Sequence, residues 1–310
     1  MKRMIGKALL AYFRTLARVR LQKISPTIIG ITGSAGKTST LQACEATLTD
    51  HFQLKVSHKA NSQSGIPLNI LDLHIDNYTL AEWLRLAVIA PFTLLTKPSY
   101  SHYLVEMGID GPDEPSNMTY LLKILQPQVG VFLNVAPTHA EPFDHLVTAT
   151  SLSDRRQQLI ELIAAEKGKL ISSLPKSGTA IINKDEPLIS NFESKTKATV
   201  ISFGSAVGST VRTVLFTSNK NGTKCVFNYN DDKEKIIFNE YLFPKSYAYT
   251  FAAALAVGIS QNLTLQQAAE SLQKNFKLPP GRSSLIPAIN NANILDSSYN
   301  ASTAPMLDML

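Results

Sequence analysis

The chain has 310 residues, of which 44% are hydrophobic and 17% are charged, and its mean hydropathy is zero. This is the composition of an ordinary globular protein, and it excludes disordered, collagen-like and coiled-coil classes. At about 100 to 200 residues per domain, the length fits two domains or one large α/β domain with additions. Cys44 and Cys225 are too few and too far apart for a disulfide framework or a zinc knuckle, so we expect a cytoplasmic protein.

The formal net charge of +6 belongs to the first 25 residues. This segment has no acidic residue, and its basic residues are Lys2, Arg3, Lys7, Arg14, Arg18, Arg20 and Lys23. Subtracting them leaves a formal charge of about −1 on the rest of the chain. A nearly neutral body argues against a nucleic-acid-binding face, because such a face gathers basic residues on the folded domain. We therefore expect no nucleic-acid partner.

The same segment carries apolar residues at helical spacing, namely Ile5, Leu9, Tyr12, Phe13, Leu16 and Val19. It is predicted to form a basic amphipathic helix over residues 1–25. Such a helix can lie on an anionic membrane surface, or it can pack on the main domain with its basic side in water. Both interpretations remain open from the sequence. Lys7 interrupts the apolar stretch and no small-residue cleavage site follows, which argues against a signal peptide.

A second apolar run covers residues 86–95 and lies between Arg85 and Lys97. A helix needs about 20 residues to cross a bilayer, so this run has half the required length. It also contains Pro91. We expect a buried or interfacial helix here rather than a membrane span.

Short β-rich runs alternate with helical stretches across the first two thirds of the chain. The runs cover residues 27–32, 102–106, 129–133, 180–183 and 199–203. This alternation predicts an α/β fold with a mainly parallel sheet and helices on both faces. Residues 211–242 contain three alternating runs separated by Asn-rich and Asp-rich turn sequences, which predicts an antiparallel meander at the edge of the sheet.

Two helices are expected after Pro244, over residues 247–259 and 264–275, with Thr264 as the N-cap of the second. Residues 279–282 then form a Pro-Pro-Gly-Arg connector. Beyond it we expect a strand over residues 293–297 and a helix starting near Pro305. One strand and one helical turn cannot bury a core of their own.

The strongest motif begins at Gly33, where an apolar strand runs into a small-residue loop and then a helix. The residues of the loop and of the first helical turn are Gly33, Ser34, Ala35, Gly36, Lys37, Thr38 and Ser39. Small residues let backbone N–H groups turn toward phosphate oxygens, and the helix N-terminus adds positive potential. Lys37 is expected to reach the β- and γ-phosphates and Thr38 to ligate Mg²⁺. The alternatives are a structural turn or a Ser-x-x-Lys acyl-enzyme motif, whose partner motifs are missing.

Two further side chains stand where parallel strands end. Glu106 closes one apolar run, and His139 follows the next. Lys167 comes later, in the sequence Glu-Lys-Gly-Lys, which we expect to lead into a helix. Open α/β sheets bind ligands at this edge, so the set suggests a second divalent ion. Taken singly, each has an ordinary interpretation: a solvated or ion-paired glutamate, a hydrogen-bonded histidine and a solvated lysine.

These motifs and their order carry a resemblance to a known family. The matching segments are 32–38, 61–67 (Asn-Ser-Gln-Ser-Gly-Ile-Pro), 106–108, 134–141, Lys167, 178–185, 280–282 and 296–301. They run in family order from about residue 26 to the end. On them the chain resembles the Mur ligase family, the ATP-dependent amide-forming enzymes of peptidoglycan precursor synthesis. The last segment is most similar to that of the member that adds D-Ala-D-Ala to a UDP-muramoyl-tripeptide.

The resemblance implies roles for individual residues. Lys37 and Thr38 would hold the ATP phosphates and a first Mg²⁺, while Glu106 and His139 would bind a second. Lys167 falls where the family carries a lysine carbamylated by CO₂, which turns a cation into an oxygen ligand for a hard metal. The resemblance also implies nucleotide contacts, by Asn183 and Asp185 near the adenine, by Arg282 at the γ-phosphate, and by Asp296.

The mechanism implied by the resemblance starts with transfer of a phosphoryl group from ATP to a substrate carboxylate. An amine then attacks the acyl phosphate, and phosphate leaves to give an amide. The implied partners are a UDP-muramoyl-peptide and D-Ala-D-Ala. Both steps build negative charge, which the two ions, Lys37 and Arg282 are expected to stabilise. Lys167 is expected to serve catalysis as a carbamylated ligand of the metal.

The chain also departs from the family pattern. Only about 26 residues precede the loop strand, where the family usually has a UDP-sugar-binding domain, and the C-terminal domain is missing after Leu310. The usual Asp-Asp-Ser-Tyr-Asn is Asp-Ser-Ser-Tyr-Asn from Asp296, and residues 244–250 lack the His and Asn often found there. We therefore expect a basic helix over 1–25, a Mur-ligase-like ATP-binding domain over 26–279, and the start of an incomplete C-terminal domain over 280–310. Complete catalysis by the 310-residue chain alone is not expected.

Three functions follow from this sequence. The first is an ATP-dependent amide ligase of peptidoglycan synthesis. The second keeps the fold and changes the acceptor, as in a folylpolyglutamate-synthase-like enzyme or a ligase that modifies lipid-linked muramoyl precursors, which the basic segment favours. The third is a non-catalytic nucleotide-binding module that kept the phosphate loop and lost turnover.

Overall fold

The computed structural model describes residues 2–96, 98–138, 140–278, 284–289, 292–296 and 298. Within them one large sheet has the strand order β2-β3-β1-β4-β5-β6-β7-β8-β9. Its strands are β1 (Thr27–Thr32), β2 (Leu54–Val56), β3 (His102–Glu106), β4 (Val129–Phe132), β5 (Thr179–Asn183), β6 (Thr199–Gly204), β7 (Val211–Asn219), β8 (Gly222–Tyr229) and β9 (Asp232–Phe238). Neighbouring strands from β2 to β7 pair in parallel, and β7, β8 and β9 pair antiparallel.

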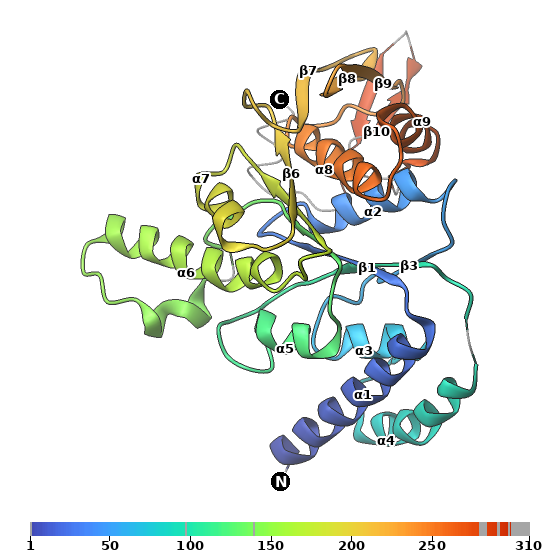
Figure 1. Cartoon of the computed structure of the whole chain (residues 1–310), viewed down its shortest axis with the longest axis vertical. Coiled ribbons are helices and arrows are strands. Elements are labelled where there is room, and N and C mark those ends of the chain that lie inside the picture. The colour runs from blue at the N-terminus through green and yellow to red at the C-terminus, as the bar shows by residue number, and fades with distance from the viewer. Residues whose placement is uncertain are drawn as a thin grey trace.

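Helices cover both faces of the sheet (Figure 1). The α-helices are α1 (Lys2–Ile24), α2 (Lys37–Leu48), α3 (Gly65–Ile70), α4 (Leu80–Ile89), α5 (Met118–Ile124), α6 (Leu152–Ser172), α7 (Pro187–Ser190), α8 (Tyr247–Ser260) and α9 (Leu265–Asn275). Short 3₁₀ segments are η1 (Ala90–Leu95), η2 (Glu141–Leu146) and η3 (Asn191–Lys195). The predicted class is confirmed: a mainly parallel sheet with helices on both faces and an antiparallel edge meander.

Two layers of buried side chains hold the helices to the sheet. On one face α2, α8 and α9 pack against apolar residues that alternate along the strands, such as Ile29 and Ile31 of β1. On the other face α1, α3, α5 and α6 bury the opposite residues, such as Ile28. This alternation follows from the two-residue period of a strand, and burial of both faces explains why the parallel strands are continuously apolar.

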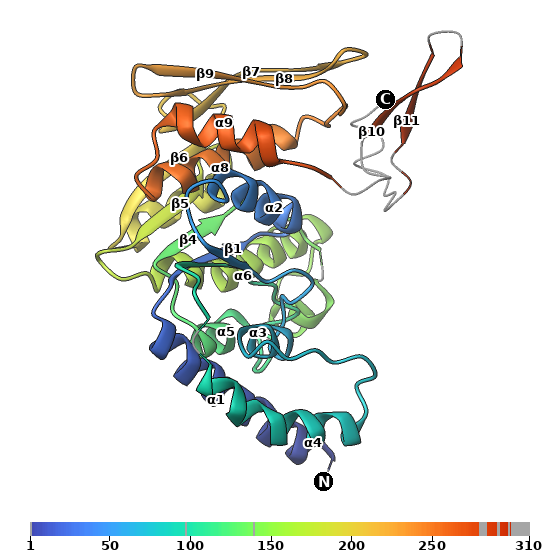
Figure 2. The same ribbon diagram turned by 90° about the vertical axis from the view of Figure 1, so that its right-hand side faces the viewer.

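The predicted helices after Pro244 are confirmed as α8 and α9. The Thr264 hydroxyl accepts the Gln267 N–H at 3.1 Å, and the Gln267 side chain accepts the Thr264 N–H at 2.9 Å. This reciprocal pair is a capping box, which fixes where α9 begins. β10 (Ser284–Pro287) and β11 (Asn293–Asp296) form an antiparallel hairpin, and Figure 2 shows it standing away from the sheet. The helix expected near Pro305 lies outside the described residues.

Two sequence-based expectations need correction. Residues Glu166 to Lys169 do not lead into a helix but lie near the C-terminal end of α6, because that helix already begins at Leu152. The run 86–95 divides between α4 and η1, and it is less buried than expected: Leu86 is buried, whereas Val88, Phe92 and Leu95 are exposed. Pro91 falls at the change from α-helix to 3₁₀ geometry, as its missing N–H would predict.

The basic segment forms a single helix, α1, which packs on α3, α4, α5 and η1. Phe13 and Ala17 of α1 are buried against these elements, and buried Arg20 forms an ion pair with Asp72 at 2.5 Å. Its neighbour α4 lies alongside at the same end of the molecule (Figure 2). Among the described residues, none of the helices combines the length and apolarity that crossing a bilayer requires.

Candidate phosphate-binding site

Three loops meet at the carboxyl edge of the parallel sheet. The loop after β1 lies between the loops after β3 and β4, because β1 pairs with both of these strands. The chain passes from β3 on one side of β1 to β4 on the other, which makes this edge a topological switch point. In open α/β sheets, ligands bind at such a point. Gly33 to Ser39, Glu106 and Asn134 are thereby brought together.

The loop after β1 has the backbone that phosphate binding requires. Gly36 has φ +76° and caps the N-terminus of α2, so a residue with a side chain would be strained there. A Cβ on Gly33 would lie 3.0 Å from Cβ of Leu133, so this glycine permits a close approach to the β4 loop. Lys37 bends back over the loop and donates to the Gly33 carbonyl at 3.0 Å. The Lys37 ammonium and the N-terminus of α2 are therefore both directed at the loop.

Asn134 ties this loop to the end of β4. Its Oδ1 accepts the Ala35 N–H at 2.8 Å, and its Nδ2 donates to the Ala35 carbonyl at 3.0 Å. The Asn134 carbonyl also accepts the Ser34 N–H at 3.0 Å. Ser34 adds a reciprocal pair with Ala136, through its Oγ, at 2.9 and 3.0 Å. The loop is thus held in shape by the neighbouring strand end.

Glu106 faces the first turn of α2. The Thr38 hydroxyl donates to Oε2 of Glu106 at 2.8 Å, and Nδ2 of Asn61 lies 3.4 Å from Oε1. A hydrogen bond from the Glu106 backbone N–H to the side-chain Oγ of Ser57, at 3.0 Å, fixes this strand end. Glu106 is buried, and its carboxylate and the Thr38 hydroxyl place adjacent oxygen atoms where a metal ion could bind them.

Lys167 approaches this site from α6. Its side chain is buried. Burial, and then the nearby charge of Lys37, lower the pKa of its ammonium to about 8 against the opposing effects of Asp110 and Glu166. Burial also lowers the pKa of Lys37, against the opposing effect of Glu106 and Asp110. Two lysines from different elements therefore share one partly desolvated, acid-lined region.

α6 positions Lys167 through its neighbours. Glu166, beside it, accepts the Met118 N–H at 3.0 Å and so caps the start of α5. A Cβ on Gly168 would lie 2.0 Å from the Phe192 ring, so only glycine lets that ring pack on the helix here. The ring and the cap together hold this turn of α6 against η3 and the start of α5.

Asn183 ends β5 and Asp185 follows it, on the far side of β4 from the loop. Nδ2 of Asn183 donates to the Leu133 carbonyl at 2.8 Å. The Asp185 carboxylate accepts the N–H groups of Ser205 and Ala206 at 2.7 and 2.8 Å and the Tyr249 hydroxyl at 3.1 Å. Both side chains therefore order the loops at this edge, and their expected adenine contacts stay predictions.

The remaining predicted residues are placed only in part. His139 and Arg282 lie outside the described residues, and Asp296 ends β11 in the hairpin. Ser39 joins the site to α8, since its Oγ lies 3.3 Å from the Tyr247 hydroxyl. Within the described ranges, groups of three or more His, Cys, Asp or Glu side chains placed to hold a metal do not occur.

Three residues of the site are not assigned a function by the sequence alone. Asn134 and Asn61 stood in segments that were matched, but neither was assigned a contact. Asp110, four residues after Glu106, was not noticed, although it raises the pKa of both lysines. A systematic search of the residues that follow each strand would have found all three, because they share the edge where the strands end.

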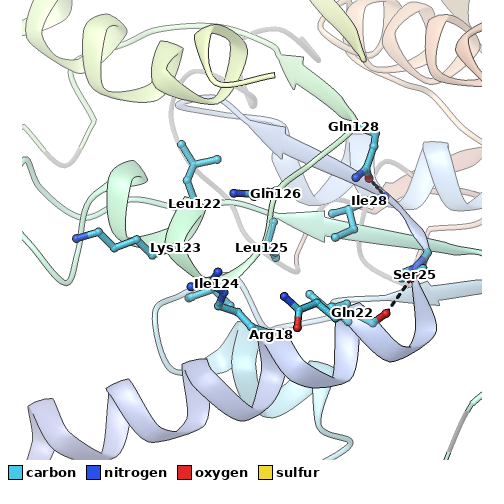
Figure 3. Close-up of a pocket in the computed structure, with 12 residues that line it drawn as sticks. Arg18, Gln22, Ser25, Ile28, Leu122, Lys123, Ile124, Leu125, Gln126 and Gln128 are labelled. Atoms are coloured by element: carbon cyan, nitrogen blue, oxygen red, sulfur yellow. Dashed lines mark hydrogen bonds between the residues drawn. The ribbon is translucent and has the colours of Figure 1, made fainter. Parts of the chain in front are cut away.

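A separate cavity of about 420 Å³ lies at the opposite, amino ends of the strands (Figure 3). Arg18 and Gln22 of α1 and Lys123 of α5 line it, together with Ile28 at the start of β1. The side chain of Gln128 also lines the cavity, and its Oε1 accepts the Ile28 N–H at 2.8 Å. The strand length separates this cavity from the glycine-rich loop, so it is not part of the candidate site.

Fold and site together define an α/β protein with a glycine-rich loop of phosphate-binding type at the switch point of a parallel sheet. The family model of the Mur ligase middle domain matches residues 31–258. The chain belongs to this family.

Curated relatives and solved structures agree with this assignment. The UDP-N-acetylmuramoyl-tripeptide--D-alanyl-D-alanine ligase of Bacillus subtilis is 25% identical over 302 residues, covering 96% of this chain and 55% of the relative. The Escherichia coli ligase of the same name is 25% identical over 304 residues, covering 96% and 57%. The chain thus spans about half the length of these relatives.

Among solved structures, MurF from Acinetobacter baumannii superposes with a TM-score of 0.73 at 18% identity, covering 97% of this chain and 56% of that one. MurF ligase from Thermotoga maritima, in complex with ADP, gives a TM-score of 0.68 at 22% identity, covering 94% and 58%. At these identities the likeness establishes the fold.

Proposed function

We propose that this chain is the ATP-binding part of an ATP-dependent amide ligase that adds D-Ala-D-Ala to a UDP-muramoyl-tripeptide. The observation that carries the proposal is the meeting of Lys37, Thr38 and Glu106 at the carboxyl edge of the sheet. The matched relatives are named for this reaction, which supports the choice of substrates. As in the sequence-based expectation, we propose a division into residues 1–25, 26–279 and 280–310, with the first segment, α1, packed on the second.

The loop is suited to a triphosphate. The first N–H groups of α2 have no partner inside the helix and can donate to phosphate oxygens. Lys37 now binds loop carbonyls, and the same ammonium can turn to a phosphate within the loop. ATP, when bound, supplies the phosphoryl group that activates a carboxylate. The chain contributes positive potential where negative charge develops.

The donor set also fits Mg²⁺, which prefers oxygen ligands. Thr38 Oγ1 and the Glu106 carboxylate lie in contact at the mouth of the loop. We propose that Thr38 holds one ion beside the phosphates and that Glu106, with His139, holds a second. The ions, when bound, would neutralise phosphate charge.

The setting of Lys167 suits carbamylation. Only a neutral amine adds CO₂, and burial with the nearby Lys37 charge brings the pKa of Lys167 to about 8. The resulting carbamate would be an anionic oxygen donor next to the cationic Lys37. We propose that it completes the magnesium ligands begun by Glu106.

The test is ADP formation by the 310-residue chain and by any longer product of the same gene. UDP-muramoyl-tripeptide and D-Ala-D-Ala are added singly and together, with folate plus glutamate as the pair expected for the alternative acceptor. For the longer product, stimulation by the first pair alone is the expected result, whereas the 310-residue chain is expected to bind ATP without completing the reaction. Stimulation by the second pair would change the acceptor, and ATP binding without any stimulation would indicate a non-catalytic module.

A further inference from the structure

The end of the molecule farthest from the meander carries an apolar surface that the fold leaves open. Leu80, Leu84 and Val88 recur every four residues and so share one face of α4. All three are exposed, and Phe92 and Leu95 of η1 continue the row at 64% and 82% exposure. We call these five residues the α4 surface. A row of exposed apolar side chains indicates an interaction site rather than scattered surface residues.

The α4 surface and the basic helix α1 belong to one rigid unit. The Tyr12 hydroxyl donates to the Ala87 carbonyl at 2.9 Å, and Nζ of Lys23 donates to the Leu94 carbonyl at 3.3 Å. The rings of Phe13 and Trp83 also pack, with centroids 5.6 Å apart. The exposed apolar row therefore lies directly beside the helix that carries the positive charge (Figure 2).

The charge of α1 is of one sign. α1 contains seven basic and no acidic residues, and Lys7, Arg18 and Lys23 are exposed. On α4, Arg85 is exposed and forms an ion pair at 3.9 Å with Glu82, whose carboxylate also accepts the Asp76 and Asn77 N–H groups. Apolar side chains flanked by cations complement an anionic lipid surface, where the apolar groups enter the headgroup layer and the cations meet phosphates.

A pocket of about 410 Å³ lies between the same two helices. Leu9 and Leu10 of α1 line it together with Leu80 and Trp83 of α4. Gln63 and Ser64, which follow Asn61 in the chain, also line it. An apolar pocket that opens beside the α4 surface can receive the end of a lipid acyl chain.

We propose that α1 and the α4 surface bind the chain to an anionic membrane surface without crossing it. The experiment is flotation of the chain with vesicles of phosphatidylcholine containing one third phosphatidylglycerol, at low salt. We expect binding that weakens at least about tenfold with pure phosphatidylcholine vesicles, since each basic side chain near an anionic surface contributes to the attraction.

A matched pair of double variants locates the binding surface. L84E/V88E places two carboxylates on the α4 surface, and L152E/V207E makes the same change of charge at two exposed apolar residues elsewhere. We expect the first variant to lose at least about tenfold in vesicle binding and the second to bind nearly as the original does. Circular dichroism checks that both fold.

Three results would overturn the proposal. The original chain could fail to float with anionic vesicles, or the two double variants could lose binding equally. The third is a dimer in sedimentation that L84E/V88E alone dissociates, which would assign the α4 surface to a second copy of the chain.

Discussion

The Thr38 hydroxyl donates a 2.8 Å hydrogen bond to Oε2 of Glu106, joining the first turn of α2 to the end of β3 across 68 residues of sequence. This bond brings an oxygen donor of the glycine-rich loop against a buried carboxylate. It shows that the two features predicted separately from the sequence belong to one place. A magnesium ion bound beside a nucleotide needs oxygen donors of this kind.

Substitution of Glu106 by Gln tests the metal role of that carboxylate. Gln keeps an oxygen that can accept from Thr38, so the fold and the melting temperature should change little. The negative charge is lost, and we expect the Mg²⁺ concentration for half-maximal nucleotide binding to rise at least about tenfold. Titration of Mg²⁺ with a fluorescent ATP analogue measures it. An unchanged Mg²⁺ requirement would remove Glu106 from the ion's ligands.

Gly36 provides a test of the loop backbone. Nothing lies within 4 Å of a Cβ at this position, so the effect of Gly36→Ala comes from its φ of +76° alone. A left-handed conformation costs an ordinary residue about 1–2 kcal/mol, and we expect that loss in unfolding free energy. Urea denaturation measures it. Gly36→Asn should lose less, because Asn tolerates this region, and equal losses would contradict the strain argument.

Gly168 tests how α6 positions Lys167. Alanine there collides with the Phe192 ring, and overpacking of this kind costs about 1–3 kcal/mol. The control is Gly6→Ala in α1, which meets nothing within 4 Å and should stabilise by up to about 1 kcal/mol. Thermal melting compares the two. If both substitutions stabilised the chain, the tight contact between α6 and Phe192 would be excluded.

The pH dependence of Lys167 follows from its lowered pKa. A pKa of about 8 makes half of the amine neutral near pH 8, whereas an ordinary lysine reaches that point only near 10.5. Carbamate formation should therefore increase as pH rises from 7 to 8.5 at constant dissolved CO₂. The ¹³C NMR signal after addition of ¹³C-bicarbonate reports it. Lys167→Arg should lack the signal, because arginine stays protonated, and an equal signal in that variant would place the adduct elsewhere.

Local patterns in the sequence predicted most of the fold. Continuous apolar runs identified β1, β3, β4, β5 and β6, because strands buried on both faces need apolar side chains at every position. Turn residues located the meander, and Thr264 marked the start of α9. Short elements such as β2 and α3 were missed. Three strand residues or six helical ones carry too little periodicity to be recognised without their tertiary partners.

The candidate site was predictable only in part. The spacing around Lys37 and Thr38 indicates phosphate binding by itself. The support of the loop by Asn134 and the shared setting of Lys37 and Lys167 depend on which strands are neighbours, and a single sequence does not specify that order. The exposure of Val88 was also unexpected, since an apolar run does not reveal which of its faces the fold leaves uncovered.

The central claim is that the loop after β1 binds ATP through Lys37. Isothermal titration of ATP with Mg²⁺ into the original chain and into Lys37→Ala tests it most directly, with Lys245→Ala as the control at an exposed lysine that lies outside the loop. The original and the control should bind ATP with the same affinity, and Lys37→Ala should lose at least about tenfold, the factor that 1.4 kcal/mol represents. Equal ATP affinity in all three chains would contradict the account.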